Sequence, residues 1–205
     1  MPIWAAAPAC RRPPRARRNE PAPVVSIPGM ARWPVSGVAL ACFVVVFATY
    51  GTRPLVPLYA ASMGIGASEI GVIVSLYAFL PLLLATSMGR LIDAHGAPRM
   101  MVCAILGCAV GLALPFLVEG RAGLFASQLI GGAGFTAFIL AAPQQITAGA
   151  ETAWDRERGV AMFAMTIALG AFAGPLAAGW LADTLDYRLA FVVMAASVLA
   201  ALPPV

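Results

Sequence analysis

The sequence GRLIDAHGAPR, residues 89–99, places one aspartate, one histidine and two arginines between two long apolar segments. About 20 mostly apolar residues lie on each side of it, roughly the length with which a helix crosses a 30 Å hydrocarbon layer. The first part of this stretch, Gly-x-Leu-x-Asp, recurs at residues 179–183 as GWLAD. The location of the polar stretch and its recurrence are the starting points for predicting the fold.

The composition indicates an integral membrane protein. Of the 205 residues, 61% are hydrophobic and 11% are charged, whereas charged residues make up about 25% of an ordinary soluble domain. The mean hydropathy is +0.88. A soluble core has no room for this much apolar surface, but a bilayer spanned by helices can accept it.

Six apolar segments follow a basic N-terminal stretch, at residues 35–60, 70–88, 99–118, 122–147, 159–182 and 188–204. In lipid, each backbone polar group must be satisfied within the protein, so these segments are predicted to be helices. Their short connections predict that helices adjacent in sequence are antiparallel neighbours. We therefore expect an all-α polytopic membrane protein, with one six-helix transmembrane domain over residues 35–205.

Residues 1–34 are rich in proline and arginine, which predicts a disordered basic tail. A secretory signal peptide fits poorly, because no apolar stretch begins until about residue 35 and that one is long. Met30, just before the first apolar segment, is an alternative start to Met1, and the sequence leaves both open. The same stretch in a soluble protein would suggest nucleic-acid binding, but next to a membrane segment it indicates the cytoplasmic side.

The distribution of arginine predicts the orientation in the membrane, since all 13 basic residues are arginines. With the N-terminus inside, the cytoplasmic side receives the tail arginines, Arg90, Arg99, Arg156 and Arg158, and the outer side receives Arg121 and Arg188. This satisfies the excess of positive charge expected inside. We therefore expect a protein of the cytoplasmic (inner) membrane with residues 89–99 in a cytoplasmic loop and residues 179–183 near the outer side.

Two segments of the chain repeat one pattern. Residues 69–72 read Glu-Ile-Gly-Val before Gly89-x-Leu91-x-Asp93, and residues 157–160 read Glu-Arg-Gly-Val before the second Gly-x-Leu-x-Asp. The second helix would run inward and the fifth outward, so the pattern predicts two inverted three-helix repeats, as found in secondary transporters. Chance matching between helices rich in small residues is the alternative.

The first of these stretches resembles a motif of the major facilitator superfamily, whose loop between helices two and three reads G-x-L-x-D-[RK]-x-G-[RK]-[RK]. The matching residues are Gly89, Leu91, Asp93 and Gly96, with Arg99 one position late and Ala94, Ala97 and Pro98 where basic residues are usual. The resemblance implies a cytoplasmic gate in which the aspartate latches two halves of the transporter, and the local partners expected for it are Arg156 and Arg158 in the next cytoplasmic loop. The alternative is that these charges only solvate helix ends.

The fifth apolar segment carries a second element that resembles the same family. Gly170-x-x-x-Gly174-Pro175-x-x-Ala178-Gly179 is similar to a G-x-x-x-G-P-x-x-G-G element associated mainly with antiporters. Glycines four residues apart let two helices approach closely, and a proline bends a helix. The resemblance implies an antiporter-like helix, whereas the similar spacing of Gly107 and Gly111 predicts only generic packing.

Arg53 is the one charged residue expected inside a span, where it costs at least about 2.5–3.5 kcal/mol unless it is paired or reaches an interface. Two interpretations stay open: an anchor at the outer interface, or, with Tyr50, part of an anion-binding cavity. Gln128 and Gln144 are further candidates for a substrate cavity, although glutamines near a proline often only satisfy the backbone. Gln128 stands where the family often has an arginine linked to proton coupling, which weakens the carry-over of that role.

The resemblance covers about residues 35–205 and implies the N-terminal six-helix half of a transporter that exports drugs or metabolites by proton-coupled antiport and alternating access. Members of the family usually have twelve helices, so we expect a truncated product; a non-transporting fragment, a scaffold subunit or a half-transporter active as a dimer are alternatives. The expected partners are the bilayer, a small-molecule substrate, protons, and a second six-helix half or a second copy. Nothing in the sequence indicates an enzyme, a cofactor or a metal site, because His95 has no companions at metal-ligand spacing and the four cysteines are typical packing residues.

Overall fold

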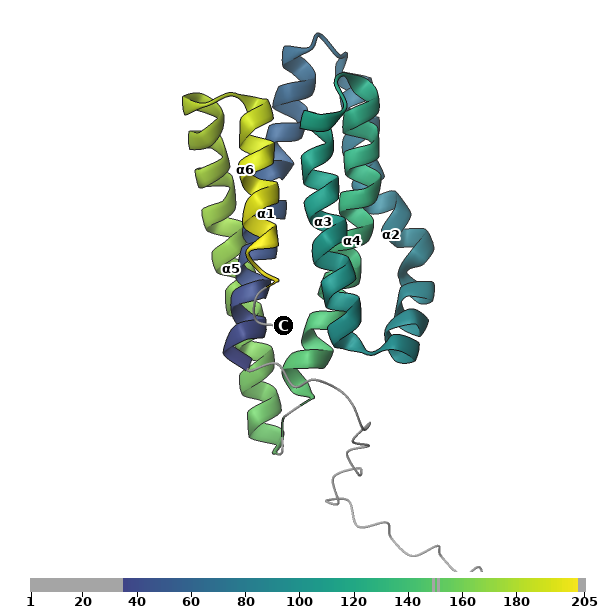
Figure 1. Ribbon diagram of the computed structural model, residues 1–205, viewed down its shortest axis with the longest axis vertical. Coiled ribbons are helices and arrows are strands. Elements are labelled where there is room, and N and C mark those ends of the chain that lie inside the picture. Colours follow the sequence, from purple (N-terminus) through teal and green to yellow (C-terminus); the bar gives the residue numbers. More distant parts are fainter. Residues whose placement is uncertain (1–34, 149, 151, 203–205) are drawn as a thin grey trace, which may run out of the picture.

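The computed structural model describes residues 35–148, 150 and 152–202, and within these it contains helices and no strand. The helices are α1 (Val35–Ser62), α2 (Ala67–His95), α3 (Ala97–Leu117), α4 (Arg121–Thr147), α5 (Ala153–Thr184) and α6 (Tyr187–Leu199) (Figure 1). This confirms the all-α prediction. The predicted tail, residues 1–34, lies outside the described residues.

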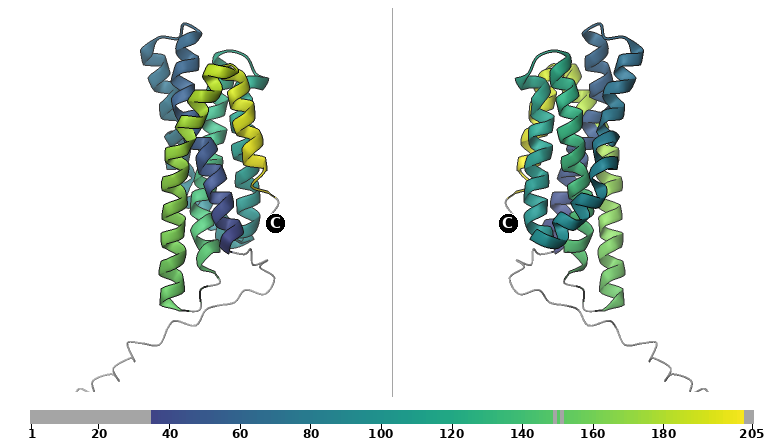
Figure 2. Two further views of the ribbon diagram at one scale, coloured as in Figure 1. Left: turned by 90° about the vertical axis from the view of Figure 1, so that its left-hand side faces the viewer. Right: turned by 90° about the vertical axis from the view of Figure 1, so that its right-hand side faces the viewer.

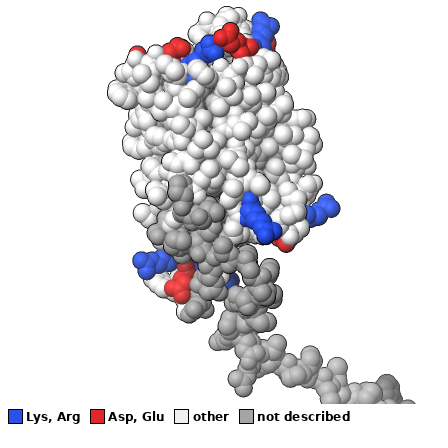
Figure 3. Space-filling model, viewed as in Figure 1, with Lys and Arg blue, Asp and Glu red and all other residues white. Residues whose placement is uncertain are grey.

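The helices run alternately in opposite directions, and their charges, apart from that of Arg53, lie toward the two ends of the bundle, as Figure 3 shows for one face. Five of them are long and apolar enough to cross a membrane. α6 has 13 residues and a length of about 20 Å, so the segment predicted at residues 188–204 forms a shorter helix than expected.

The predicted neighbours are partly wrong. The closest packing joins α3 to α4, α1 to α5, α2 to α4 and α3 to α6, whereas α2 touches its sequence neighbours α1 and α3 only slightly. The six helices therefore form two layers, with α5, α1, α4 and α2 in one and α3 and α6 in the other (Figures 1 and 2). Short connections fix direction, but the shapes of the helix surfaces decide which helices pack together.

Glycine determines the tightest of these contacts. A Cβ on Gly174 of α5 would collide with the carbonyl oxygen of Phe47 on α1, and one on Gly132 of α4 would collide with the backbone of Tyr77 on α2. If α1, α2 and α3 are matched with α4, α5 and α6 in that order, the α1–α5 pair corresponds to the α4–α2 pair. Two repeats of opposite orientation would produce this arrangement.

The stretch that was expected to form the first cytoplasmic loop is almost entirely helical. α2 continues to His95, α3 begins at Ala97, and Gly96 alone connects them with a φ of 84°. Likewise, the loop expected at residues 155–159 lies inside α5, whose first turn is capped by Thr152 and Asp155 in a reciprocal capping box. With 29 residues, α2 is about 43 Å long, so it can extend its polar end beyond the hydrocarbon layer without ending the helix.

Candidate functional site

The guanidinium of Arg53 lies among three aromatic rings contributed by three helices. Its Cζ is 4.0 Å from the ring centroid of Tyr50 on α1, 5.1 Å from that of Tyr77 on α2 and 5.7 Å from that of Phe135 on α4. The three rings also contact one another, with centroids 5.9 Å apart for Tyr50 and Phe135 and 6.1 Å apart for Tyr77 and Phe135. We call these four residues the Arg53 cluster.

The direction of the Arg53 side chain bears on the two interpretations of this residue. Tyr50 precedes Arg53 by about one turn, so the guanidinium points back toward the N-terminal end of α1, as helical side chains commonly do. The opposite end of the bundle is where α2 and α4 begin. Tyr77 lies about 15 Å along α2 from its first residue, and Phe135 lies about 21 Å along α4 from its first residue. The charge therefore lies well inside the span, which disfavours an anchor at the outer interface.

Next to the guanidinium is a small pocket of about 20 Å³ with both apolar and polar residues in its lining. Its polar lining consists of Thr49, Thr52, Arg53, Tyr77, Ser127 and Gln128. Both threonine hydroxyls donate to carbonyl oxygens one turn earlier on α1, which leaves their oxygen lone pairs able to accept. The Tyr77 hydroxyl is buried beside Arg53, and no well-aligned hydrogen bond fixes it. The pocket has room for one water molecule or one ligand oxygen.

The aromatic rings compensate only part of the cost of the buried charge. Cation–π contacts contribute about 0.5–2 kcal/mol, less than the 2.5–3.5 kcal/mol or more that an arginine at this depth costs. None of the nine acidic residues of the chain lies deep within a predicted span. The side chain of Arg53 is itself exposed, so the guanidinium remains open to a partner from outside this six-helix bundle.

Of the residues predicted to form a substrate cavity, the structure groups three and separates one. Tyr50, Arg53 and Gln128 lie together, but Gln144 is 16 residues after Gln128 on α4, about 24 Å along the helix. Gln144 instead lines a hollow of about 310 Å³ together with Asp93 and Gly96 at the end where α2 meets α3. Gln144 therefore does not line the pocket beside Arg53, and its role stays a prediction.

The predicted gate residues lie in two groups that this structure does not bring together. The first group lies on both sides of the α2–α3 turn and consists of Gly89, Leu91, Asp93, Gly96 and Arg99. Asp93 is exposed beside the hollow. Arg156 and Arg158 are exposed in the first turns of α5, which makes no contact with α2 over the described ranges. Asp93 forms no ion pair with either of them in the part of the chain that the structure describes.

The element predicted on the fifth helix has the packing role expected of its first two glycines. Gly170 and Gly174 are buried against the backbone of α1, near Phe43, Phe47 and Gly51. Gly179 has open space around it and belongs to no such contact. Gly107 and Gly111 pack in the same manner against glycines of α4, so close glycine packing by itself does not distinguish an antiporter element.

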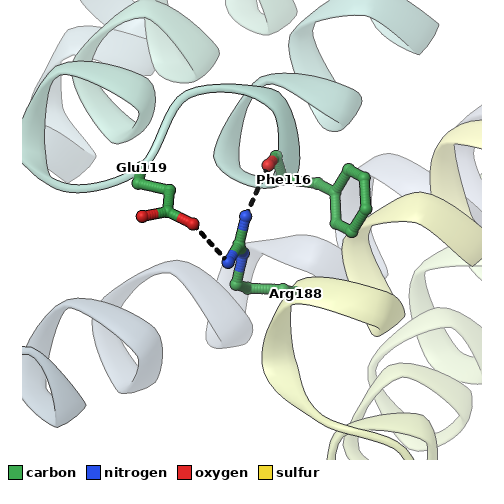
Figure 4. Close-up of polar contacts among 3 residues, drawn as sticks. All are labelled: Phe116, Glu119 and Arg188. Carbon is green, nitrogen blue, oxygen red and sulfur yellow. Dashed lines mark hydrogen bonds and ion pairs between the residues drawn. The ribbon is translucent and has the colours of Figure 1, made fainter.

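Sequence reasoning missed the contacts of Arg188 at the other end of the bundle. Its guanidinium donates to a carboxylate oxygen of Glu119 at 2.8 Å and to the carbonyl oxygen of Phe116 at 2.7 Å (Figure 4). The Phe116 carbonyl is in the last turn of α3 and has no partner within that helix. A second ion pair, Glu69 with Arg121 at 3.4 Å, lies at the same end. An arginine at the start of an apolar segment was the only signal in the sequence.

The comparison with known protein families agrees with this arrangement of helices. The sequence model of the Major Facilitator Superfamily matches residues 38–204, which is most of the chain. This chain belongs to the Major Facilitator Superfamily. No curated protein matches it.

As a superfamily member, the chain is an integral membrane protein of a transporter family, rather than a member of an enzyme family. The layer of α5, α1, α4 and α2 is covered by α3 and α6 on one face and by no described helix on the other (Figure 2), and we call it the uncovered layer. Its two outer helices, α2 and α5, are the least buried. Within the most apolar stretch of each helix, the buried share is 6% in α2 and 11% in α5, compared with 50–61% in α1, α3 and α4. The Arg53 cluster belongs to this same layer, since it is built from α1, α2 and α4.

Proposed function

We propose that this chain supplies one six-helix unit of a secondary transporter that exports small organic solutes by alternating access, with proton antiport as the driving reaction. The observation that carries the proposal is the Arg53 cluster: a cation inside the span, next to a small pocket with several polar side chains, on the uncovered layer. A residue so costly in lipid is typical of a substrate or ion pathway.

In this proposal the uncovered layer faces a second six-helix unit, and the solute binds between the two. The second unit is either another polypeptide segment or a second copy of this chain. The exposed apolar residues of α2 and α5 flank the Arg53 cluster on both sides and would form the contact. Solute binds through Tyr50, Arg53 and Gln128, and rocking of the two units exposes the site to one side of the membrane at a time.

The hollow beside Asp93 belongs to the proposed cytoplasmic gate. Gly96 holds the ends of α2 and α3 together, while Asp93 and Gln144 face the space into which a partner group can enter. Because α2 and α5 are separate here, a pairing of Asp93 with Arg156 or Arg158 would form only in another conformation. We further propose the inner membrane as the location, with this end of the bundle and the N-terminus in the cytoplasm.

Export and proton coupling rest on the likeness of α5 to the antiporter element, and a flux assay tests them. Inside-out vesicles that contain the protein are acidified by respiration, and their pH gradient is followed with a quenched dye while a panel of organic solutes is added. We expect at least one solute to release quenching in these vesicles and not in vesicles from cells without the protein. A panel that gives identical traces in both kinds of vesicle would count against proton-coupled export.

The partner of the uncovered layer is tested by crosslinking. Phe79 on α2 and Phe172 on α5 are exposed, and cysteines introduced at these positions in a background without native cysteines should crosslink between copies if two chains associate through this layer. Cysteine at Leu106, exposed on α3 in the other layer, is the matched control. Crosslinks that form only through residue 106 would place the contact on the layer of α3 and α6 and contradict the proposal.

A further inference from the structure

The Arg53 cluster carries information about the charge of the solute. A guanidinium offers five N–H donors in a planar fork that fits two oxygens of a carboxylate. In the structure three aromatic rings surround the guanidinium, and their faces attract the cation but accept no conventional hydrogen bond. The side chain of Arg53 also remains exposed. The natural complement of this group is an oxyanion.

The adjacent pocket supplies the remaining contacts that an oxyanion requires. The hydroxyls of Tyr77 and Ser127 and the amide of Gln128 can donate, and all three side chains line the same 20 Å³ as Arg53. That volume has room for one oxygen atom. The Tyr77 hydroxyl is buried beside the Arg53 guanidinium, and its own hydrogen can turn toward such an oxygen.

We infer that the solute is an organic anion and that its carboxylate binds at Arg53, with one oxygen on the guanidinium and the other in the pocket beside Tyr77. The carbon skeleton of the solute then lies outside the pocket, against the rings of Tyr50 and Phe135, so a planar or aromatic acid fits best. This inference rests on the proposed function, because it names the substrate class of the same site.

The two obvious competitors for Arg53 are an acidic side chain from a second unit and a lipid phosphate. An acidic side chain would leave no vacant site for an added acid. A lipid phosphate would compete with it, although the guanidinium lies well inside the span and far from the headgroups. An acidic side chain or a lipid at Arg53 would therefore change the measured binding of an added soluble acid.

The test is binding of benzoate to the full-length protein in a non-ionic detergent without phospholipid, followed by saturation-transfer NMR. We expect benzoate to bind and methyl benzoate, which lacks the charge, to bind much more weakly. Arg53→Gln should weaken benzoate binding about tenfold or more, because a charge-assisted pair is lost. Tyr77→Phe, which keeps the ring and removes the hydroxyl, should weaken it by a smaller factor.

Arg121→Gln, at the end of the bundle and outside the cluster, is the matched control and should leave benzoate binding unchanged. Each variant is first checked for a single symmetrical peak in gel filtration. Equal binding of benzoate to wild type and Arg53→Gln overturns the inference, and so does an absence of binding to wild type. Loss of benzoate binding on addition of phosphatidylglycerol would assign the site to lipid and overturn it as well.

The flux assay separates this inference from the proposed function. Benzoate binding that depends on Arg53, with no solute-driven proton flux, would contradict the transport proposal and leave the anion site standing. Flux that is driven by uncharged or cationic solutes and is unchanged in Arg53→Gln would support transport and overturn the anion site.

Discussion

At the scale of single residues, Gly96 matters because it turns α2 into α3 without any other loop residue. Its φ of 84° is a conformation that residues with a Cβ rarely adopt. With a ψ of 148° it lies in a region open almost only to glycine, so we expect Gly96→Ala to lower the free energy of unfolding by about 1–3 kcal/mol. Thermal unfolding in detergent measures the change.

Gly89→Ala is the matched control for Gly96→Ala. Gly89 lies in the same motif but inside α2, and a Cβ there would meet nothing within 4 Å. Alanine at this position should leave the unfolding temperature unchanged or raise it, since glycine costs about 0.5–1 kcal/mol within a helix. Equal losses in the two variants would show that the motif does not depend on the turn at Gly96.

Arg188 is expected to matter more for stability than Arg121, although both form an ion pair at the same end. Arg188→Met keeps the apolar stem but removes the bonds to Glu119 and to the Phe116 carbonyl, and we expect a loss of about 1–3 kcal/mol. Arg121→Met removes a longer pair whose arginine is more exposed than Arg188, for which about 0–1 kcal/mol is typical. The two thermal unfolding curves, compared side by side, test the ranking; a larger loss for Arg121→Met would reverse it.

At the scale of helices, the contact between α1 and α5 depends on a glycine that no other residue can replace without moving a backbone. Gly174→Ala would place a Cβ against the Phe47 carbonyl and 2.9 Å from the Gly51 nitrogen. We expect a destabilisation of about 1–3 kcal/mol, the usual cost of overpacking. Gly179→Ala, five residues later in the same helix, meets nothing within 4 Å and should be tolerated. Thermal unfolding of the two variants decides; indifference to Gly174→Ala would mean that the helices are not in close contact.

The sequence predicted where the helices lie because long apolar runs can form little else in a membrane. It did not predict their ends at residues 89–95 and 153–158, since polar residues at the membrane edge are compatible with either a loop or a longer helix. Nor did it predict which helices pack together, because Gly132 and Gly174 make sense only once the opposing backbone is known. The close approach of glycines on α5 was foreseen, but its partner was not.

Within the candidate site, the sequence could predict only contacts between residues of the same helix. Tyr50 lies one turn before Arg53, so their proximity follows from helical spacing. Tyr77 and Phe135 come from other helices and carry no signal in the sequence that links them to Arg53. Gln144 was grouped with Arg53 by its polarity alone, whereas its position at the far end of α4 places it beside Asp93.

At the scale of the whole molecule, the predicted orientation can be tested with one cysteine at each end of α2. Ser68 and Ala94 are exposed at opposite ends of the bundle. In intact cells, a membrane-impermeant maleimide should label a cysteine at Ser68 and spare one at Ala94, because the positive charge of the Ala94 end favours the cytoplasm. Both should react after the membrane is permeabilised. Labelling of Ala94 alone in intact cells would invert the orientation and, with it, the assignment of the gate to the cytoplasmic side.

The two ends of the bundle are held together by different forces. Both ion pairs in the described part of the chain, Glu69–Arg121 and Glu119–Arg188, lie at the end opposite the α2–α3 turn. The turn end is held by the backbone of Gly96 instead. Dissolved ions screen exposed charges over about 3 Å at 1 M salt but leave backbone geometry unchanged. In the expected orientation, the salinity of the surrounding medium would therefore loosen or tighten the outward end alone, while the cytoplasmic end would be insensitive to it.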